Sequence, residues 1–222
     1  VHVYCAEGAT CSNYKEVDGE IKLRAGNKTD PFQVINDAIL EAKALNLKKV
    51  IVASRGGSGY YDEVVYMGQG ISLLGGYRHT DWTRDITTNA TEIRSNRSIV
   101  LSLKGTGSKV EYSLDGLTIR STSESNGSVV LIENAGSQFS IVNNTILCHG
   151  TSNTTGIKIE LSNIRIINNT ISAGSSLNEI KGIDASNSST LIIGNTIETG
   201  PGKGDGILAS DMSSRTIIIK NN

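Results

Sequence analysis

The sequence predicts an all-β chain wound into a solenoid of stacked strands. A phrase of β-branched residues ending in asparagine occurs four times, and a second phrase, a glycine followed by alternating apolar and polar residues, occurs three times between its copies. The asparagines of the first phrase recur every 25 or 26 residues, a period too long for a heptad and too short for most helical repeats. We therefore expect coils of about 24–27 residues. These asparagines are Asn144, Asn169, Asn195 and Asn221.

A short amphipathic helix is expected ahead of the coils, over residues 31–45. Thr29 and Asp30 supply capping side chains, and Pro31 suits the first helical position. Apolar residues then recur with helical spacing on one face. An uncovered solenoid end presents unpaired backbone groups and apolar core, so we expect this helix to cover it. The apolar face consists of Phe32, Ile35, Ile39 and Ala42.

The first strands follow this helix. Three short β-rich runs, separated by glycine turns, are predicted to form them. The runs are residues 49–53, 63–66 and 71–74, and the turns contain Gly56-Gly57 and Gly68-Gln69-Gly70.

Each asparagine phrase predicts a strand, a sharp corner and a second strand. Asparagine suits the corner because its short side chain tolerates the left-handed conformation and bonds to nearby backbone. With coils stacked about 4.8 Å apart, the four asparagines fall into one column whose amides bond to one another. Isoleucines after the corner point inward and the threonines before them outward. These are Ile146, Ile171 and Ile197, and Thr145, Thr170 and Thr196.

The glycine phrase predicts a turn followed by a strand with one face buried. Its copies are residues 156–160, 182–186 and 206–210. The inward positions are Ile157, Ile183 and Ile207, then Ile159, Ala185 and Ala209. The outward positions are Lys158, Asp184 and Leu208, then Glu160, Ser186 and Ser210.

These repeats resemble the right-handed parallel β-helix of the pectin-lyase-like superfamily, in which a strand ends at an Asn-Asn corner once per turn. The resemblance is clear over residues 110–222. The helix with Pro31 and Phe32, the strand at 50–53 and the turn Gly75-Gly76-Tyr77 look like the first coils of secreted bacterial β-helix surface proteins. The resemblance implies a right-handed parallel β-helix with a capping helix, secreted or associated with the cell surface or outer membrane.

We expect a single domain over residues 1–222, with the N-terminal segment and cap over 1–48 and the coils over 49–222. The last phrase stops at Asn222 where the other copies continue with Thr-Ile, so we expect the coils to continue in a longer protein. A formal net charge of -1 with scattered lysines and arginines argues against a nucleic-acid partner. The longest apolar runs are strand-sized, so no transmembrane segment is expected.

The cysteines give one hint about the compartment. Cys5 and Cys11 are close enough in sequence to close a small loop, and we expect a disulfide there, which would suit an oxidising environment; the alternative is that both are ordinary thiols. Cys148 precedes His149, a pairing that can mark a nucleophile or a metal site. With three histidines in the chain, we expect Cys148 to be an ordinary loop residue.

Lys158, Glu160 and Asp184 are the weak catalytic candidates. Polysaccharide lyases and hydrolases of the resembled superfamily use acidic residues, often with Ca²⁺, and a basic residue on the outer face of one sheet. Lys158 and Asp184 stack in one predicted column, and Glu160 follows two residues along. The alternative interpretation is a solvated face with one cross-strand ion pair, which is worth little.

The sequence thus favours a non-catalytic cell-surface module that is adhesive, carbohydrate-binding or structural, with a polysaccharide or a surface protein as partner and no cofactor. The alternative is a polysaccharide lyase or glycoside hydrolase that acts on acidic polysaccharide, with Ca²⁺ as its cofactor. A fold by itself does not choose between them.

Overall fold

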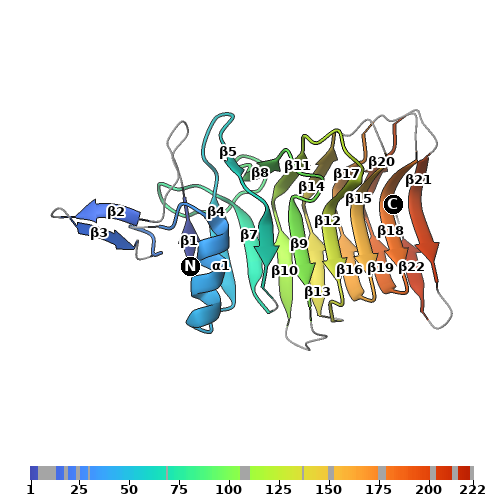
Figure 1. Ribbon diagram of the computed structural model, residues 1–222, viewed down its shortest axis with the longest axis horizontal. Coiled ribbons are helices and arrows are strands. Elements are labelled where there is room, and N and C mark those ends of the chain that lie inside the picture. Colours follow the sequence, from blue (N-terminus) through green and yellow to red (C-terminus); the bar gives the residue numbers. More distant parts are fainter. Residues whose placement is uncertain are drawn as a thin grey trace.

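The computed structural model shows a parallel β-solenoid of about six turns with one short helix at its N-terminal end (Figure 1). The all-β prediction and the stacked parallel strands are confirmed. The structure describes residues 1–4, 14–17, 20–23, 26–29, 31–68, 70–105, 111–136, 138–149, 153–174, 179–200, 204–211 and 215–220.

Three parallel sheets form the walls of the solenoid. Sheet 1 contains β1 (His2–Val3), β4 (Lys49–Ala53), β7 (Ser72–Tyr77), β10 (Tyr112–Asp115), β13 (Phe139–Val142), β16 (Asn163–Ile167), β19 (Ser189–Ile193) and β22 (Ile217–Lys220). Sheet 2 contains β5 (Tyr60–Asp62), β8 (Glu92–Ser95), β11 (Thr118–Ser121), β14 (Thr145–Cys148), β17 (Thr170–Ser172) and β20 (Thr196–Glu198). Sheet 3 contains β6 (Val65–Met67), β9 (Leu101–Lys104), β12 (Gly127–Glu133), β15 (Thr154–Glu160), β18 (Ile180–Ser186) and β21 (Gly204–Ser210).

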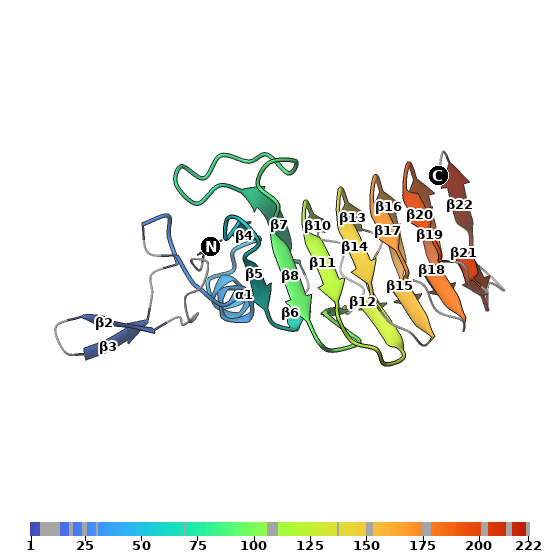
Figure 2. The same cartoon turned by 90° about the horizontal axis from the view of Figure 1, so that it is seen from above.

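A separate antiparallel hairpin of β2 (Tyr14–Val17) and β3 (Glu20–Leu23) extends away from the solenoid in both views (Figures 1 and 2). It precedes the helix and belongs to none of the three walls.

The core is a set of in-register columns. One inward column of sheet 1 advances by 27, 25, 26 and 27 residues per coil, which agrees with the predicted period. Its members are Leu114, Ile141, Ile166, Ile192 and Ile219. The first four are fully buried, whereas Ile219 is 51% exposed because β22 is the last strand of its sheet. Ala209, predicted to be buried, is exposed for the same reason on β21.

Helix α1 (Ile35–Ala44) packs its apolar face against β1, β4 and β6. The predicted face is confirmed for Ile35, Ile39 and Ala42, but the predicted start at Pro31 is wrong and Phe32 lies outside the helix. Phe32 forms a parallel bridge with Val3, which extends the chain there as a strand and delays the helix until Ile35. Thr29 donates to Asn27 instead of capping the helix, and Asp30 lies outside the described residues. The buried helix residues are Ile35, Ala38, Ile39 and Ala42.

Glu63 caps this helix from a distant part of the chain. Its carboxylate accepts hydrogen bonds from the backbone N–H groups of Ile35 at 2.9 Å and Asn36 at 3.2 Å. The Asn36 side chain also donates to Glu63 and accepts from the backbone N–H of Tyr66. The strand predicted over residues 63–66 is therefore observed as β6, which begins only at Val65, and Glu63 lies between β5 and β6 with its carboxylate on the helix.

At the asparagine corner, one residue adopts the left-handed conformation and the next residue forms the hydrogen bonds between coils. The left-handed conformation belongs to Asn143, Asn168 and Gly194, with φ of 54°, 54° and 64°. The next residue forms the hydrogen-bonded column: the side-chain amide of Asn144 donates to Asn169 Oδ1 at 3.0 Å, and that of Asn169 donates to Asn195 Oδ1 at 2.9 Å. The prediction that one asparagine does both is wrong, and Asn221 lies outside the described residues.

A second corner, between sheets 3 and 1, carries a serine column that sequence analysis missed. The Ser162 hydroxyl accepts from the N–H of Ala135 at 2.9 Å, and the Ser188 hydroxyl accepts from the N–H of Ser162 at 3.0 Å. The residue before each of these positions is left-handed, as at the asparagine corner. These left-handed residues are Asn134, Leu161 and Asn187, and Asp211 is left-handed at the position of Asn187 in the next coil.

The repeated glycines of the second phrase lie inside strands, so the turns predicted there are wrong. A Cβ on Gly182 would lie 2.3 Å from Ile197 Cγ2 and 2.5 Å from the carbonyl oxygen of Gly206. Gly156 is equally crowded by the coil above it. Glycine is required here because the backbone of the next coil occupies the place of a side chain.

Candidate binding groove

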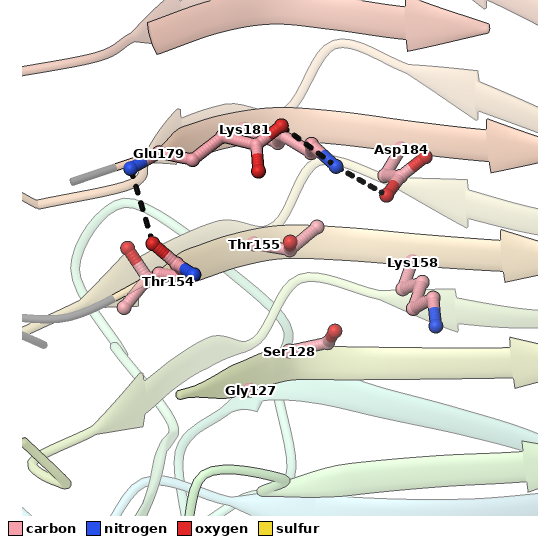
Figure 3. A pocket seen from close by; sticks show the side chains of 9 residues that line it. Gly127, Ser128, Thr154, Thr155, Lys158, Glu179, Lys181 and Asp184 are labelled. Atoms are coloured by element: carbon pink, nitrogen blue, oxygen red, sulfur yellow. Dashed lines mark hydrogen bonds and ion pairs between the residues drawn. The ribbon is translucent and has the colours of Figure 1, made fainter. Parts of the chain in front are cut away.

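A shallow groove crosses the outer face of sheet 3 over strands β12, β15 and β18 (Figure 3). Its volume is about 200 Å³, and its walls are mainly polar. The lining residues are Gly127, Ser128, Asn153, Thr154, Thr155, Lys158, Glu179, Lys181 and Asp184.

The strand register brings two of the three candidate residues into this groove. Lys158 and Asp184 are partners on neighbouring strands, as the repeat predicted. Glu160 follows Lys158 on the same outer face, beyond the groove lining. Sequence analysis missed Lys181, the register partner of Thr155, and Glu179 just before β18.

The charged residues pair along the chain rather than across strands. Lys158 Nζ lies 2.6 Å from Glu160 Oε1. Lys181 Nζ lies 3.2 Å from both Glu179 Oε1 and Asp184 Oδ2. The single cross-strand pair of Lys158 with Asp184 is therefore replaced by two neighbouring ion-pair groups.

Lys181 and Asp184 are the most enclosed of the charged groups in the groove. The side chain of Lys181 is 18% exposed and that of Asp184 13%. Burial alone would lower the pKa of Lys181, but hydrogen bonds from its ammonium group to Glu179 and Asp184 outweigh burial and raise the pKa. Lys181 therefore stays protonated at neutral pH and suits donation of hydrogen bonds better than abstraction of a proton.

One edge of the groove is fixed by a third row of hydrogen bonds between coils. The backbone N–H of Asn153 donates to Asn126 Oδ1, and the N–H of Glu179 donates to Asn153 Oδ1, each at 3.1 Å. The hydroxyl of Thr154 donates to the carbonyl of Ala173 at 2.8 Å. The polar groups at this edge therefore have fixed positions before any ligand arrives.

Calcium would need six to eight oxygen ligands. The carboxylates nearest the groove are those of Glu160, Glu179 and Asp184, and each is ion-paired with a lysine. A lysine ammonium beside each carboxylate opposes a second cation, so these residues do not fit the Ca²⁺ of the lyase alternative. Within the described ranges, no group of three or more His, Cys, Asp and Glu side chains is arranged to hold a metal ion.

Cys148 lies in strand β14 and points into the core, so its prediction as a loop residue is wrong. Burial raises the pKa of its thiol to about 12, and Sγ lies 3.5 Å from the carbonyl of Thr155. A thiol in this state is a poor nucleophile. The disulfide considered for Cys5 and Cys11 lies outside the described residues.

Comparisons of the chain with protein-family models, with curated proteins and with solved structures found no match. In the part of the chain that the structure describes, no helix has the length and apolar character needed to cross a membrane.

Proposed function

We propose that this protein is a non-catalytic module of a bacterial cell-surface or secreted protein that binds carbohydrate through the groove on sheet 3. We further propose that its coils are right-handed, as in the pectin-lyase-like superfamily that its corners resemble. In this proposal the solenoid is a rigid support, and its outer face holds a polysaccharide chain against the bacterial surface.

The observation that carries this proposal is the arrangement of hydrogen-bonding groups in the groove. Ser128, Thr155 and Lys181 occupy one register position on three successive strands, and Lys158 and Asp184 occupy a second. Successive groups are therefore spaced by the strand separation of about 4.8 Å. Fixed donors and acceptors at this spacing, in an open groove, suit the hydroxyl groups of an extended sugar polymer (Figure 3).

The pairing of charges favours binding over turnover. A lyase needs a base that can accept a proton from the sugar, whereas each groove lysine is ion-paired with a carboxylate. The Lys158–Glu160 pair is the more exposed one, so any proton transfer would use this pair and not Lys181.

The test is retention on a panel of immobilised neutral and acidic polysaccharides, with chain cleavage recorded on the same samples with and without Ca²⁺. We expect retention without cleavage, and loss of retention in Thr155→Val and Lys181→Met. The matched control is Lys104→Met, because Lys104 lies on the same sheet and is ion-paired with Glu133 outside the groove. Cleavage that disappears in Lys158→Ala would overturn the non-catalytic proposal, and retention that survives both groove variants would overturn the assignment of the groove.

A further inference from the structure

One column of outward side chains crosses all six strands of sheet 3 and continues the line of the groove. Two of its members, Lys158 and Asp184, line the groove itself. Three strand spacings of about 4.8 Å separate Tyr66 from Lys158, which is roughly 14 Å along the solenoid axis (Figures 1 and 2). The column consists of Tyr66, Ser102, Leu131, Lys158, Asp184 and Leu208.

Tyr66 lies at the N-terminal end of this column, and its ring is open to solvent. It is 65% exposed, between the buried residues Val65 and Met67. Within the described part of the chain, no aromatic ring or guanidinium group lies over the ring of Tyr66. The other tyrosines whose side chains are described each have such a group against them. They are Tyr4, Tyr60, Tyr61, Tyr77 and Tyr112.

The backbone of Tyr66 is held in place by helix α1. Its N–H donates to Asn36 Oδ1 at 2.8 Å. The amide of Asn36 in turn donates to Glu63 Oε2 at 2.9 Å and to the carbonyl of Val64 at 2.7 Å. The base of the ring is therefore fixed before any ligand arrives, which lowers the entropic cost of binding. An exposed aromatic ring on a rigid support suits packing against the C–H groups on the flat face of a sugar.

The column between Tyr66 and the groove carries no charge. Ser102 is small and 7% exposed, and Leu131 is half-buried. A sugar chain that leaves the groove along the column therefore passes over a small side chain and an apolar one. It reaches Tyr66 without leaving sheet 3.

The charges on this face favour a neutral ligand over an acidic one. On the described outer face of sheet 3 and in its groove, five carboxylates stand beside three lysines, and each lysine is ion-paired. An acidic chain would be repelled by the excess carboxylates and would have to displace existing ion pairs. The carboxylates are Glu133, Glu160, Glu179, Asp184 and Asp205, and the lysines are Lys104, Lys158 and Lys181.

We propose that a neutral polysaccharide lies along the solenoid axis over this column and stacks one of its sugar rings on Tyr66. This binding mode rests on the carbohydrate-binding function proposed above, and it specifies the class of polysaccharide and a second point of contact. A disaccharide in the groove is too short to reach Tyr66, whereas a hexasaccharide covers both. The contribution of Tyr66 to affinity should therefore depend on the length of the sugar chain.

Isothermal titration calorimetry of the full chain measures this dependence. The probes are the disaccharides and hexasaccharides of cellulose, xylan and chitin, with hexagalacturonate as the acidic probe. We expect a neutral hexasaccharide to bind more tightly than its disaccharide and than hexagalacturonate. Tyr66→Ala should weaken binding of that hexasaccharide about tenfold and leave the disaccharide unchanged. Tyr66→Phe should keep the wild-type affinity, because the ring and not the hydroxyl makes the contact.

The matched control is Leu40→Ala, because Leu40 is 64% exposed and lies on α1 outside the column. It should leave binding of both probe lengths unchanged. Thr155→Val in the groove should weaken binding of both. Circular dichroism checks that each variant is folded. If Tyr66→Ala does not fold, Tyr66→Val removes the ring and keeps a residue that favours strands.

Three outcomes would contradict the binding mode in different ways. Equal hexasaccharide binding in wild type and Tyr66→Ala, with loss in Thr155→Val, would overturn the role of Tyr66 and leave the groove as the binding site. Tighter binding of hexagalacturonate than of any neutral hexasaccharide would overturn the neutral class. Absence of binding to every probe would overturn the carbohydrate-binding function itself and the contact with Tyr66 along with it.

Discussion

Asn169 should contribute more to stability than any exposed residue of its coil. Its side chain makes five hydrogen-bond contacts: the two amide hydrogens are shared among the carbonyls of Ile141 and Ile167 and Asn195 Oδ1, and the amide oxygen accepts from the backbone and side-chain N–H groups of Asn144. It is 1% exposed. Asn169→Ala removes all five and leaves the Asn144 backbone N–H buried without its acceptor. At about 1 kcal/mol per bond, with the unsatisfied donor added, the expected loss is about 3–5 kcal/mol.

Urea unfolding followed by circular dichroism measures this loss. The matched control is Asn168→Gly at the same corner, because glycine accepts the φ of 54° and Asn168 is outside the column. We expect the control to change the free energy of unfolding by less than about 1 kcal/mol. A loss below about 1 kcal/mol in Asn169→Ala, or equal losses in both variants, would refute the reasoning.

Asn169→Asp adds a dependence on pH to the same test. The variant carboxylate would face the carbonyls of Ile141 and Ile167 without a proton to donate, so its folded-state pKa is expected to lie above the unfolded value of about 3.9. Stability is then highest below the unfolded pKa and is lost as the pH rises through the folded pKa. A variant whose stability is independent of pH between 3 and 7, relative to wild type, would contradict this direction.

Three further predictions concern single positions elsewhere in the fold. Leu161→Asn should stabilise the protein by about 1 kcal/mol in urea unfolding, because Leu161 has φ of 52° and is 57% exposed, and a loss of stability would contradict this. Gly182→Ala should destabilise it by at least about 2 kcal/mol through overlap with Ile197 and the Gly206 carbonyl, whereas a neutral result would show that the coils can separate. Burial raises the folded-state pKa of Glu63 above its unfolded-state pKa. The stability of wild type relative to Glu63→Gln should therefore fall as the pH rises through the folded-state pKa. The same pH dependence of the melting temperature in wild type and in Glu63→Gln would exclude this titration.

The sequence predicted the parts of the fold that repeat. Each coil meets the next in register, so a residue type needed at one level is needed again about 26 residues later. The column of Asn144, Asn169 and Asn195 and the inward isoleucines were therefore visible as a pattern. The register of Lys158 with Asp184 followed from the same period.

The parts that sequence analysis missed depend on contacts without a period. Glu63 caps a helix 28 residues away, and no local motif connects it to Ile35. The serine column was not recognised for two reasons. The first of its three positions is occupied by Ala135 and not by serine. The left-handed position before Ser162 is occupied by Leu161, where an asparagine or glycine would have indicated a corner. Lys181 was missed because the repeated phrase begins at Gly182, although the strand itself begins at Ile180.

The row of asparagines inside the solenoid has a direction. The side-chain amide of Asn144 donates to Asn169 in the following coil, and that of Asn169 donates in the same direction to Asn195. The amide dipoles therefore point the same way and add along the axis, and each bond polarises and strengthens the next. Rotating one amide by 180° would place donor against donor on one side and acceptor against acceptor on the other. The aligned side-chain amides therefore give the interior of the solenoid a dipole along its axis.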